Sequence, residues 1–277
     1  MVGSGLSDIR MGIDVVLNFL KYVDRHDVCP EYAANIKQAQ EVCLLALEEA
    51  PAIEALVELL PGHFNTALRM LHGTDHKDEH LGFVYNQAIP DPKHSKLSVA
   101  VTLSTLMPHD DRFHTPAEWY VIDTHELTFE IMAITLPDDG VRAKFKTINE
   151  HFHGETDIQP CGTITAAPLI LRDGWDTTRT TTPREFDGED TQFILEEDIL
   201  RHLKEGMMLD LCVCTLNVGL RFIKYVKAVK PTYYEFLPQE LMLNYKEPVA
   251  NERPAKSIYD WDDEEALDGV VAGDRDE

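Results

Sequence analysis

The feature that most constrains the fold is a change in the spacing of apolar residues about seventy residues into the chain. Up to that point apolar residues recur every three or four positions, which is the period of a helix with one buried face. This spacing predicts four helices, with Ser7 as the N-cap of the first. They are expected over residues 7–23, 36–47, 51–60 and 64–71. The N-terminal part is therefore expected to form a helical layer.

In the middle of the chain apolar residues alternate with polar or small ones, which is the period of a half-buried strand. The segment "ELTFEIMAI" has this pattern, with Leu127, Phe129 and Ile131 on one face. An antiparallel sheet of about four to six strands is expected. The predicted strands cover residues 96–106, 119–123, 126–134, 141–148 and 163–171.

The C-terminal part returns to helical spacing after a loop rich in threonine, proline and glycine at residues 178–190. Residues 192–229 are expected to be helical, although 211–218 also alternate as a strand would, and that choice stays open. The predicted fold class is α+β, with an N-terminal helical layer, a central mostly antiparallel sheet and C-terminal helices packed on it. A single domain is expected over 7–255, followed by an acidic, disordered tail over 256–277.

The net charge argues against direct binding to nucleic acid. The chain has 25 basic and 49 acidic side chains, a net charge of −24, which repels a phosphate backbone. Direct nucleic-acid binding is therefore not expected, and a basic protein surface is a more natural partner. No apolar run reaches the roughly 20 residues needed to cross a bilayer, and the first residues do not resemble a signal peptide. We expect a soluble, intracellular protein with no membrane contact.

The segment "RHDVCPEY" gathers potential ligands where the first helix should end. His26, Asp27 and Cys29 lie within four positions, but a metal site needs three or four converging ligands and no second cluster is paired with them. Pro30 fits the first position of a helix and disfavours helix at the residue before it. A structural corner is the favoured interpretation.

Scattered histidines raise the alternative of a metal-dependent enzyme. They include His109, His114, His125, His151 and His153, but none stands in a metal-binding motif. The five cysteines match neither a zinc nor a disulfide framework. No phosphate-binding glycine loop, nucleophile elbow or dinucleotide fingerprint occurs. The sequence predicts a protein that is not an enzyme, with no metal and no cofactor.

Two tryptophans lie in polar surroundings suited to partner binding. A large aromatic side chain in an exposed loop can serve as an interface anchor, although Trp175 can instead close one end of the sheet. Acidic neighbours surround the second tryptophan, Trp261. The candidate partner-binding residues are Gly174, Trp175, Tyr259, Trp261, Asp262, Asp263 and Glu264.

Two sequence blocks resemble the fungal argonaute-binding protein family, a subunit of the argonaute siRNA chaperone complex. They are "VVLNFLKYVDRHDVCPEY" near the start and "CTLNVGLRFIKYVKAVKPTYYEFLPQELMLNYKEPVANERPA" near the end. The resemblance implies a non-enzymatic protein that binds argonaute and a second small subunit. It also implies that the protein holds argonaute with duplex siRNA and restrains passenger-strand release, in a nuclear and cytoplasmic pathway leading to heterochromatin. An acidic histone-binding module remains an alternative.

Overall fold

The computed structural model describes residues 4–73, 91–113, 118–152, 158–169 and 190–234. All of them belong to one compact unit, Met1–Phe236. A second unit, Leu237–Glu277, lies outside the described residues.

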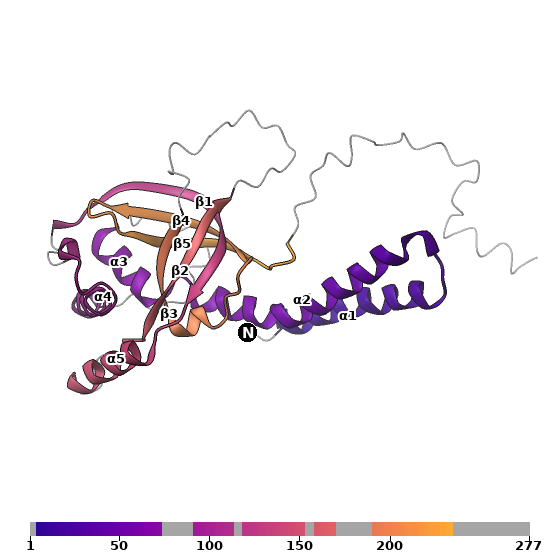
Figure 1. Cartoon of the computed structure of the whole chain (residues 1–277), viewed down its shortest axis with the longest axis horizontal. Helices are drawn as coiled ribbons and strands as arrows, with labels where there is room; N and C mark the ends of the chain where they lie inside the picture. Colours follow the sequence, from indigo (N-terminus) through magenta and orange to yellow (C-terminus); the bar gives the residue numbers. More distant parts are fainter. Residues whose placement is uncertain (1–3, 74–90, 114–117, 153–157, 170–189, 235–277) are drawn as a thin grey trace, which may run out of the picture. The chain divides into compact units, whose positions relative to one another are not determined.

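The N-terminal helices agree with the sequence prediction except at Ser7 and Pro51. Helix α1 begins at Ser4, so Ser7 lies inside it and is not its N-cap. Helix α1 (Ser4–Arg25) and helix α2 (Ala33–Leu59) lie side by side as a hairpin, and α3 (His63–His72) follows (Figure 1). The prediction of separate helices over 36–47 and 51–60 is wrong, because α2 runs through Pro51 without a break. The proline removes one N–H donor. Burial of Ala50 and Leu56 on either side compensates for that loss.

Residues 96–106 were expected to be a strand and instead form most of helix α4 (Pro92–Leu106). The alternation that suggested a strand arises because this helix is buried on much of its circumference. Its small polar residues Ser98 and Thr102 are buried as well as its apolar ones. The sequence indicates a helix more clearly at its start than through its apolar spacing. There the Asp91 carboxylate accepts a hydrogen bond from the Lys93 N–H, and Pro92 occupies the first turn.

Residues 141–148 were also expected to be a strand and lie in helix α5 (Asp139–His151). Asp138 caps this helix by accepting the Val141 N–H at 2.7 Å. Val141, Phe145 and Ile148 follow the four- and three-residue spacing of one helical face. Phe145 is the fully buried member of that face.

The sheet contains five antiparallel strands in the order β3-β2-β1-β4-β5, within the expected four to six. This observation confirms the α+β fold class and the antiparallel sheet. The strands are β1 (Val121–Thr135), β2 (Cys161–Leu169), β3 (Thr191–Glu196), β4 (Met208–Leu216) and β5 (Arg221–Lys230). The short helices are η1 (Pro30–Tyr32), η2 (Asp111–Phe113) and α6 (Glu197–Leu200).

The prediction of C-terminal helices over residues 192–229 is wrong. That segment forms β3, β4 and β5, and α6 is its only helix. The alternative interpretation of 211–218 as strand holds for 211–216, which lie in β4. Gly219 adopts a φ of +82° in the turn that joins β4 to β5. Glycine reaches this conformation without steric cost, so the turn to an antiparallel neighbour forms there.

The two edge strands of the sheet are bridged by a single side chain from α3. Asn65 is fully buried and donates from Nδ2 to the backbone oxygen of Ile194 in β3 at 2.9 Å. Its Oδ1 accepts the backbone N–H of Ile223 in β5, also at 2.9 Å. The amide therefore satisfies one group of each edge strand, and the sheet curls so that β3 and β5 approach α3 from both sides.

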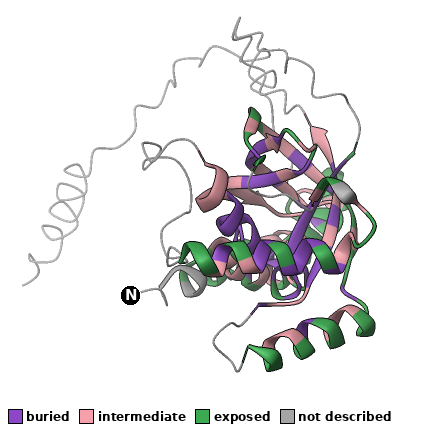
Figure 2. Ribbon diagram, turned by 90° about the vertical axis from the view of Figure 1, so that its left-hand side faces the viewer, coloured by how far each residue is buried: buried purple, intermediate pink, exposed green. Residues whose placement is uncertain are grey.

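The buried apolar residues, which lie among those coloured purple in Figure 2, form two clusters. The first includes Phe129 and Phe193, whose rings meet edge to face at 5.3 Å between centroids. The second contains Phe64 of α3, Phe222 of β5 and Trp119. Alternate residues of β3 and β5 belong to different clusters, so both faces of these strands are buried. Their sequences therefore lack the apolar–polar alternation of a half-buried strand.

Helix α2 is attached to the end of β5 through a buried carboxylate. Glu49 is fully buried and accepts the Thr232 N–H at 3.0 Å and the Thr232 hydroxyl at 2.7 Å. The neighbouring Glu48 pairs with Lys204 at 2.7 Å. These contacts fix α2 to the segment that follows β5 and to the segment that precedes β4.

Candidate partner-binding surface

The structure leaves the sequence-predicted partner-binding residues untested. Gly174 and Trp175 belong to the segment 170–189, and Tyr259, Trp261, Asp262, Asp263 and Glu264 to 235–277, both outside the described residues. The described tryptophan, Trp119, is only 6% exposed and packs edge to face on Phe113 at 5.9 Å. Trp119 is therefore a core residue.

The "RHDVCPEY" segment forms the corner that the sequence predicts. Helix α1 ends at Arg25, Asp27 adopts a positive φ of 50°, and Pro30 begins the short helix η1. Across the described ranges, no group of three or more His, Cys, Asp or Glu side chains is arranged to hold a metal ion. His125 pairs with Asp123 at 2.8 Å, whereas His114 and His153 are outside the described residues.

The α1–α2 hairpin exposes more large apolar side chains than any other part of the described structure. A surface of this kind on a folded domain is a common mark of protein–protein contact. The exposed residues are Ile9, Met11, Val15, Val16, Phe19, Tyr22, Val28, Tyr32, Val42 and Leu44. The helical spacing of the first segment predicted the helix, but it did not indicate which of its apolar side chains are exposed.

Four of these side chains form one stripe, here called the outer face of α1. Met11, Val15, Phe19 and Tyr22 are 58–64% exposed and fall within an arc of about 80° at 100° per residue. Leu17, on the opposite side, is only 5% exposed. Helix α1 therefore has apolar side chains both toward and away from its described neighbours.

A buried carboxylate lies beside the start of α3. Glu196 is 4% exposed, and its Oε1 accepts the Phe64 N–H at 2.6 Å, in the first turn of the helix. Burial raises the pKa of Glu196 above its ordinary value, although the hydrogen bond from Phe64 opposes this shift. Gly62, with a φ of +89°, leaves room for the carboxylate, because a Cβ there would overlap it.

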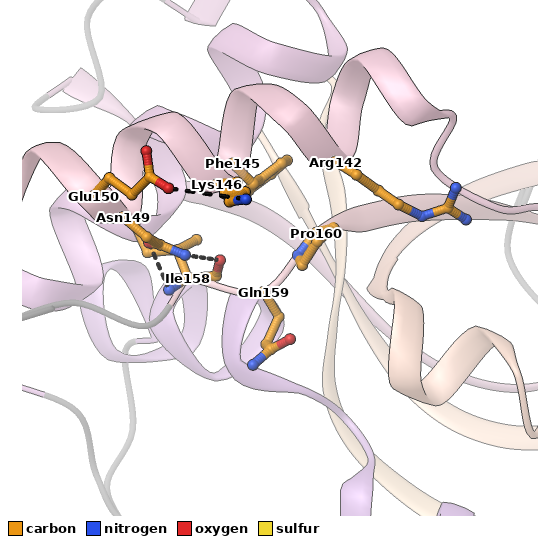
Figure 3. Close-up of a pocket in the computed structure, with 8 residues that line it drawn as sticks. All are labelled: Arg142, Phe145, Lys146, Asn149, Glu150, Ile158, Gln159 and Pro160. Atoms are coloured by element: carbon orange, nitrogen blue, oxygen red, sulfur yellow. Dashed lines mark hydrogen bonds and ion pairs between the residues drawn. The ribbon is translucent and has the colours of Figure 1, made fainter.

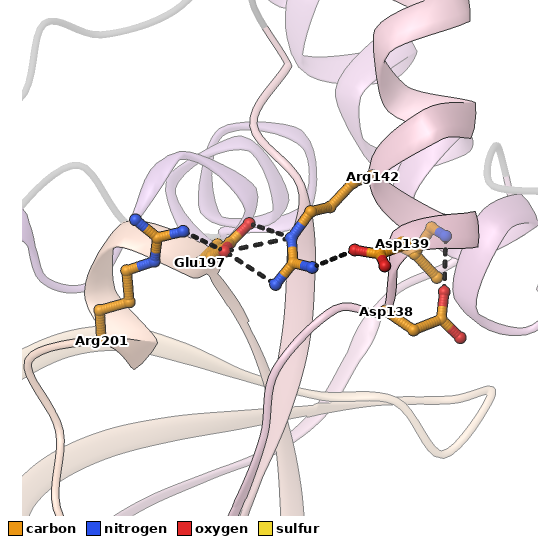
Figure 4. Close-up of polar contacts among 6 residues, drawn as sticks. Asp138, Asp139, Arg142, Glu197 and Arg201 are labelled. Atoms are coloured by element: carbon orange, nitrogen blue, oxygen red, sulfur yellow. Dashed lines mark hydrogen bonds and ion pairs between the residues drawn. The ribbon is translucent and has the colours of Figure 1, made fainter.

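An ion-pair cluster joins α5 to α6 (Figure 4). Glu197 accepts two hydrogen bonds from Arg142, through Nε at 3.1 Å and Nη2 at 3.0 Å, and one from Arg201 at 2.6 Å. Arg142 lowers the pKa of Glu197, and Arg201 adds to the shift. The contact between Arg142 and Glu197 holds α5 against α6. Because both arginines pair with the Glu197 carboxylate, this carboxylate is not free to act as a nucleophile or base.

A shallow pocket of about 440 Å³ lies between α5 and the start of β2 (Figure 3). Phe145 and Pro160 give it apolar walls, while Arg142 and Lys146 are basic. Asn149 is used structurally, because it donates to the Ile158 oxygen at 3.0 Å and accepts the Ile158 N–H at 3.1 Å. The pocket therefore lacks a pair of groups placed for acid–base or nucleophilic catalysis.

The cysteines of the sheet are unsuited to thiol chemistry. Cys161, Cys212 and Cys214 are buried, and all five cysteines of the chain are free. Burial raises the pKa of Cys212 to about 11 and also raises that of Cys161, so neither forms a thiolate at neutral pH. Tyr225, which hydrogen-bonds Glu126, also has a raised pKa because of burial.

Comparison with known proteins places this α+β chain in a family of subunits of a multiprotein complex. The chain belongs to the family of the Argonaute siRNA chaperone (ARC) complex subunit Arb1, whose model matches residues 2–248. It is 24% identical over 255 residues to Argonaute-binding protein 1 of Schizosaccharomyces pombe, and this match covers 84% of the chain but 57% of the relative. No solved structure matches the chain. None of the described helices is long and apolar enough to span a membrane.

Proposed function

We propose that this chain is a non-enzymatic argonaute-binding subunit of an siRNA chaperone complex. In this role it holds argonaute with duplex siRNA and restrains release of the passenger strand during RNA-directed heterochromatin formation. The observation that carries the proposal is the family match across residues 2–248. The name of the fission yeast relative, Argonaute-binding protein 1, supports argonaute as the partner.

The charge of the chain supports an indirect contact with RNA. A net charge of −24 opposes approach to a phosphate backbone, and argonaute supplies the RNA-binding surface in the proposed complex. The chain then acts on the duplex by stabilising one state of argonaute. A protein that binds duplex-loaded argonaute more tightly than guide-loaded argonaute opposes passenger-strand loss by linkage.

We also propose that the chain binds a second small subunit of the same complex and that it is located in both the nucleus and the cytoplasm. The exposed apolar side chains of the α1–α2 hairpin support a role in assembly, because surfaces of this kind commonly mark protein–protein contact. Trp175 and Trp261, which lie outside the described residues, remain proposed anchors for a partner. Truncation of Trp175 or Trp261 to alanine is expected to weaken argonaute binding by about 2 kcal/mol if that residue is an interface hot spot.

Affinity purification of the tagged full chain from its native cells tests the function. Argonaute, siRNA of both strands and a second small protein are the expected co-purifying molecules. Recovery of free core histones without argonaute, lost as salt rises, would favour the acidic histone-binding module. Stoichiometric iron or zinc in the purified chain would favour the metal-dependent enzyme.

A further inference from the structure

The outer face of α1 has a pattern that matches itself when reversed. Met11 and Tyr22 stand at its ends, and Val15 and Phe19 lie between them. When two copies of a helix pack antiparallel around a two-fold axis, the residues that face each other have position numbers with a constant sum. Met11 with Tyr22 gives 33 and Val15 with Phe19 gives 34, so the two sums differ by one and a single axis between residues 16 and 17 brings both pairs nearly opposite each other.

Charges at the two ends of the stripe obey the same symmetry. Asp8 stands three residues before Met11, and Arg25 stands three residues after Tyr22. Both are exposed, and within the described residues neither takes part in an ion pair shown by the structure. Their numbers add to 33, so an antiparallel pair of α1 helices places Asp8 of each copy beside Arg25 of the other. Opposite charges at these positions favour this register over a parallel arrangement, which would place like charges together.

Gly12 gives an independent reason to expect a close neighbour. It lies in the middle of α1, where glycine is less stable than alanine, and a Cβ built there would meet nothing within 4 Å. The described structure therefore offers no steric reason for glycine at this position. Gly12 lies next to Met11 at the edge of the outer face, and a residue without a side chain there leaves room for a second helix to approach closely.

We propose that this protein forms a two-fold symmetric homodimer in which the outer faces of α1 pack antiparallel. The self-complementary order of apolar and charged residues favours a second copy of this chain over an unrelated helix, which has no reason to need that symmetry. The contact goes beyond the proposed function. If that function also holds, the dimer brings two loaded argonautes into one assembly.

The first test is the mass of the purified full chain in solution, measured by sedimentation equilibrium. The parental chain is expected at twice its 31.4 kDa mass. The double variant Val15→Asp, Phe19→Asp is expected to raise the dimer dissociation constant by about 100-fold or more, because two-fold symmetry repeats each lost contact. The control Gln38→Asp adds a carboxylate at an exposed position of α2 and should leave the mass unchanged.

Further variants test the orientation and the fold separately. Asp8→Arg and Arg25→Asp should each weaken the dimer, and the two together should restore it. Met11→Cys chains mixed with Tyr22→Cys chains, in a Cys29→Ser, Cys43→Ser background, should form a disulfide-linked dimer that neither gives alone. Gly12→Ala should raise the melting temperature of the monomeric double variant while weakening dimerisation in the parental chain.

The possible outcomes separate this proposal from argonaute binding. A parental chain that stays monomeric at all concentrations would overturn the homodimer, whether or not it binds argonaute. A dimer that survives Val15→Asp, Phe19→Asp with circular dichroism unchanged would also overturn it. Loss of argonaute from that variant, with the parental chain monomeric, would instead assign the outer face to the partner. Dimerisation without any argonaute would leave the homodimer intact and refute the proposed function.

Discussion

Replacement of Asn65 by leucine should cost about 3 kcal/mol of stability, an unusually large effect for one polar residue. Leucine keeps nearly the same size but removes the amide that joins the two edge strands. The Ile223 N–H, the Ile194 oxygen and the Pro61 oxygen each lose a hydrogen bond of 2.9 Å in a fully buried place. A buried polar group without a partner costs about 1–3 kcal/mol, and local rearrangement recovers part of the total.

Thermal and urea unfolding of the full chain, followed by circular dichroism, measure this loss. A drop of about 10 °C in melting temperature is expected from about 3 kcal/mol in a chain of this size. Asn149→Leu is the matched control, because Asn149 also makes two backbone hydrogen bonds but is only partly buried, so water can replace them. An Asn65→Leu variant within about 1 kcal/mol of the parental chain would refute the bridging role of this residue.

Other predictions concern titration, the corner and RNA. The pKa of Glu196 is higher in the folded state than in the unfolded chain. The contribution of Glu196 to folding stability is therefore complete below the ordinary pKa of about 4.3, and it is lost as pH rises through the folded-state pKa. Glu196→Gln should therefore gain stability relative to the parental chain at pH 8 and not at pH 4, as urea unfolding at both pH values would record. Glu197 has a lowered pKa, so Glu197→Gln should destabilise the chain at pH 7, and the difference should vanish as pH falls through the folded pKa. Pro30→Ala should lower stability by about 1 kcal/mol or less in a thermal scan, whereas Cys29→Ser should stay soluble and keep its partner. Bare duplex siRNA should not bind the isolated chain in a gel-shift assay, and sub-micromolar binding would contradict the indirect contact with RNA.

The sequence was informative where one face of an element is buried and the other is in water. The helical period of α1 was predicted correctly apart from its start. The alternation over 126–134 lies in β1, although β1 is one strand that also includes part of the separately predicted strand over 119–123. The prediction failed in α4, where buried Ser98 and Thr102 imitate the alternation of a strand. It failed again in β3 and β5, because both of their faces contribute to the core and their apolar runs resemble a buried helix.

The outer face of α1 could also be predicted only in part from the sequence. The spacing predicted α1 as a helix, but the exposure of Met11, Val15, Phe19 and Tyr22 becomes evident only when α2 is seen to cover the opposite side. Asn65 carries no sequence signal at all, since its role depends on two strands that are more than 120 residues away. Local patterns cannot report contacts of that separation.

The affinity of the purified chain for argonaute tests the central claim most directly. Argonaute loaded with duplex siRNA and argonaute loaded with guide strand alone should be titrated side by side at one physiological salt concentration. We predict tighter binding to the duplex-loaded form, with slower release of a labelled passenger strand when the chain is present. Equal affinity for the two forms and an unchanged release rate would contradict passenger-strand restraint, and absence of binding to either form would contradict the argonaute-binding function itself.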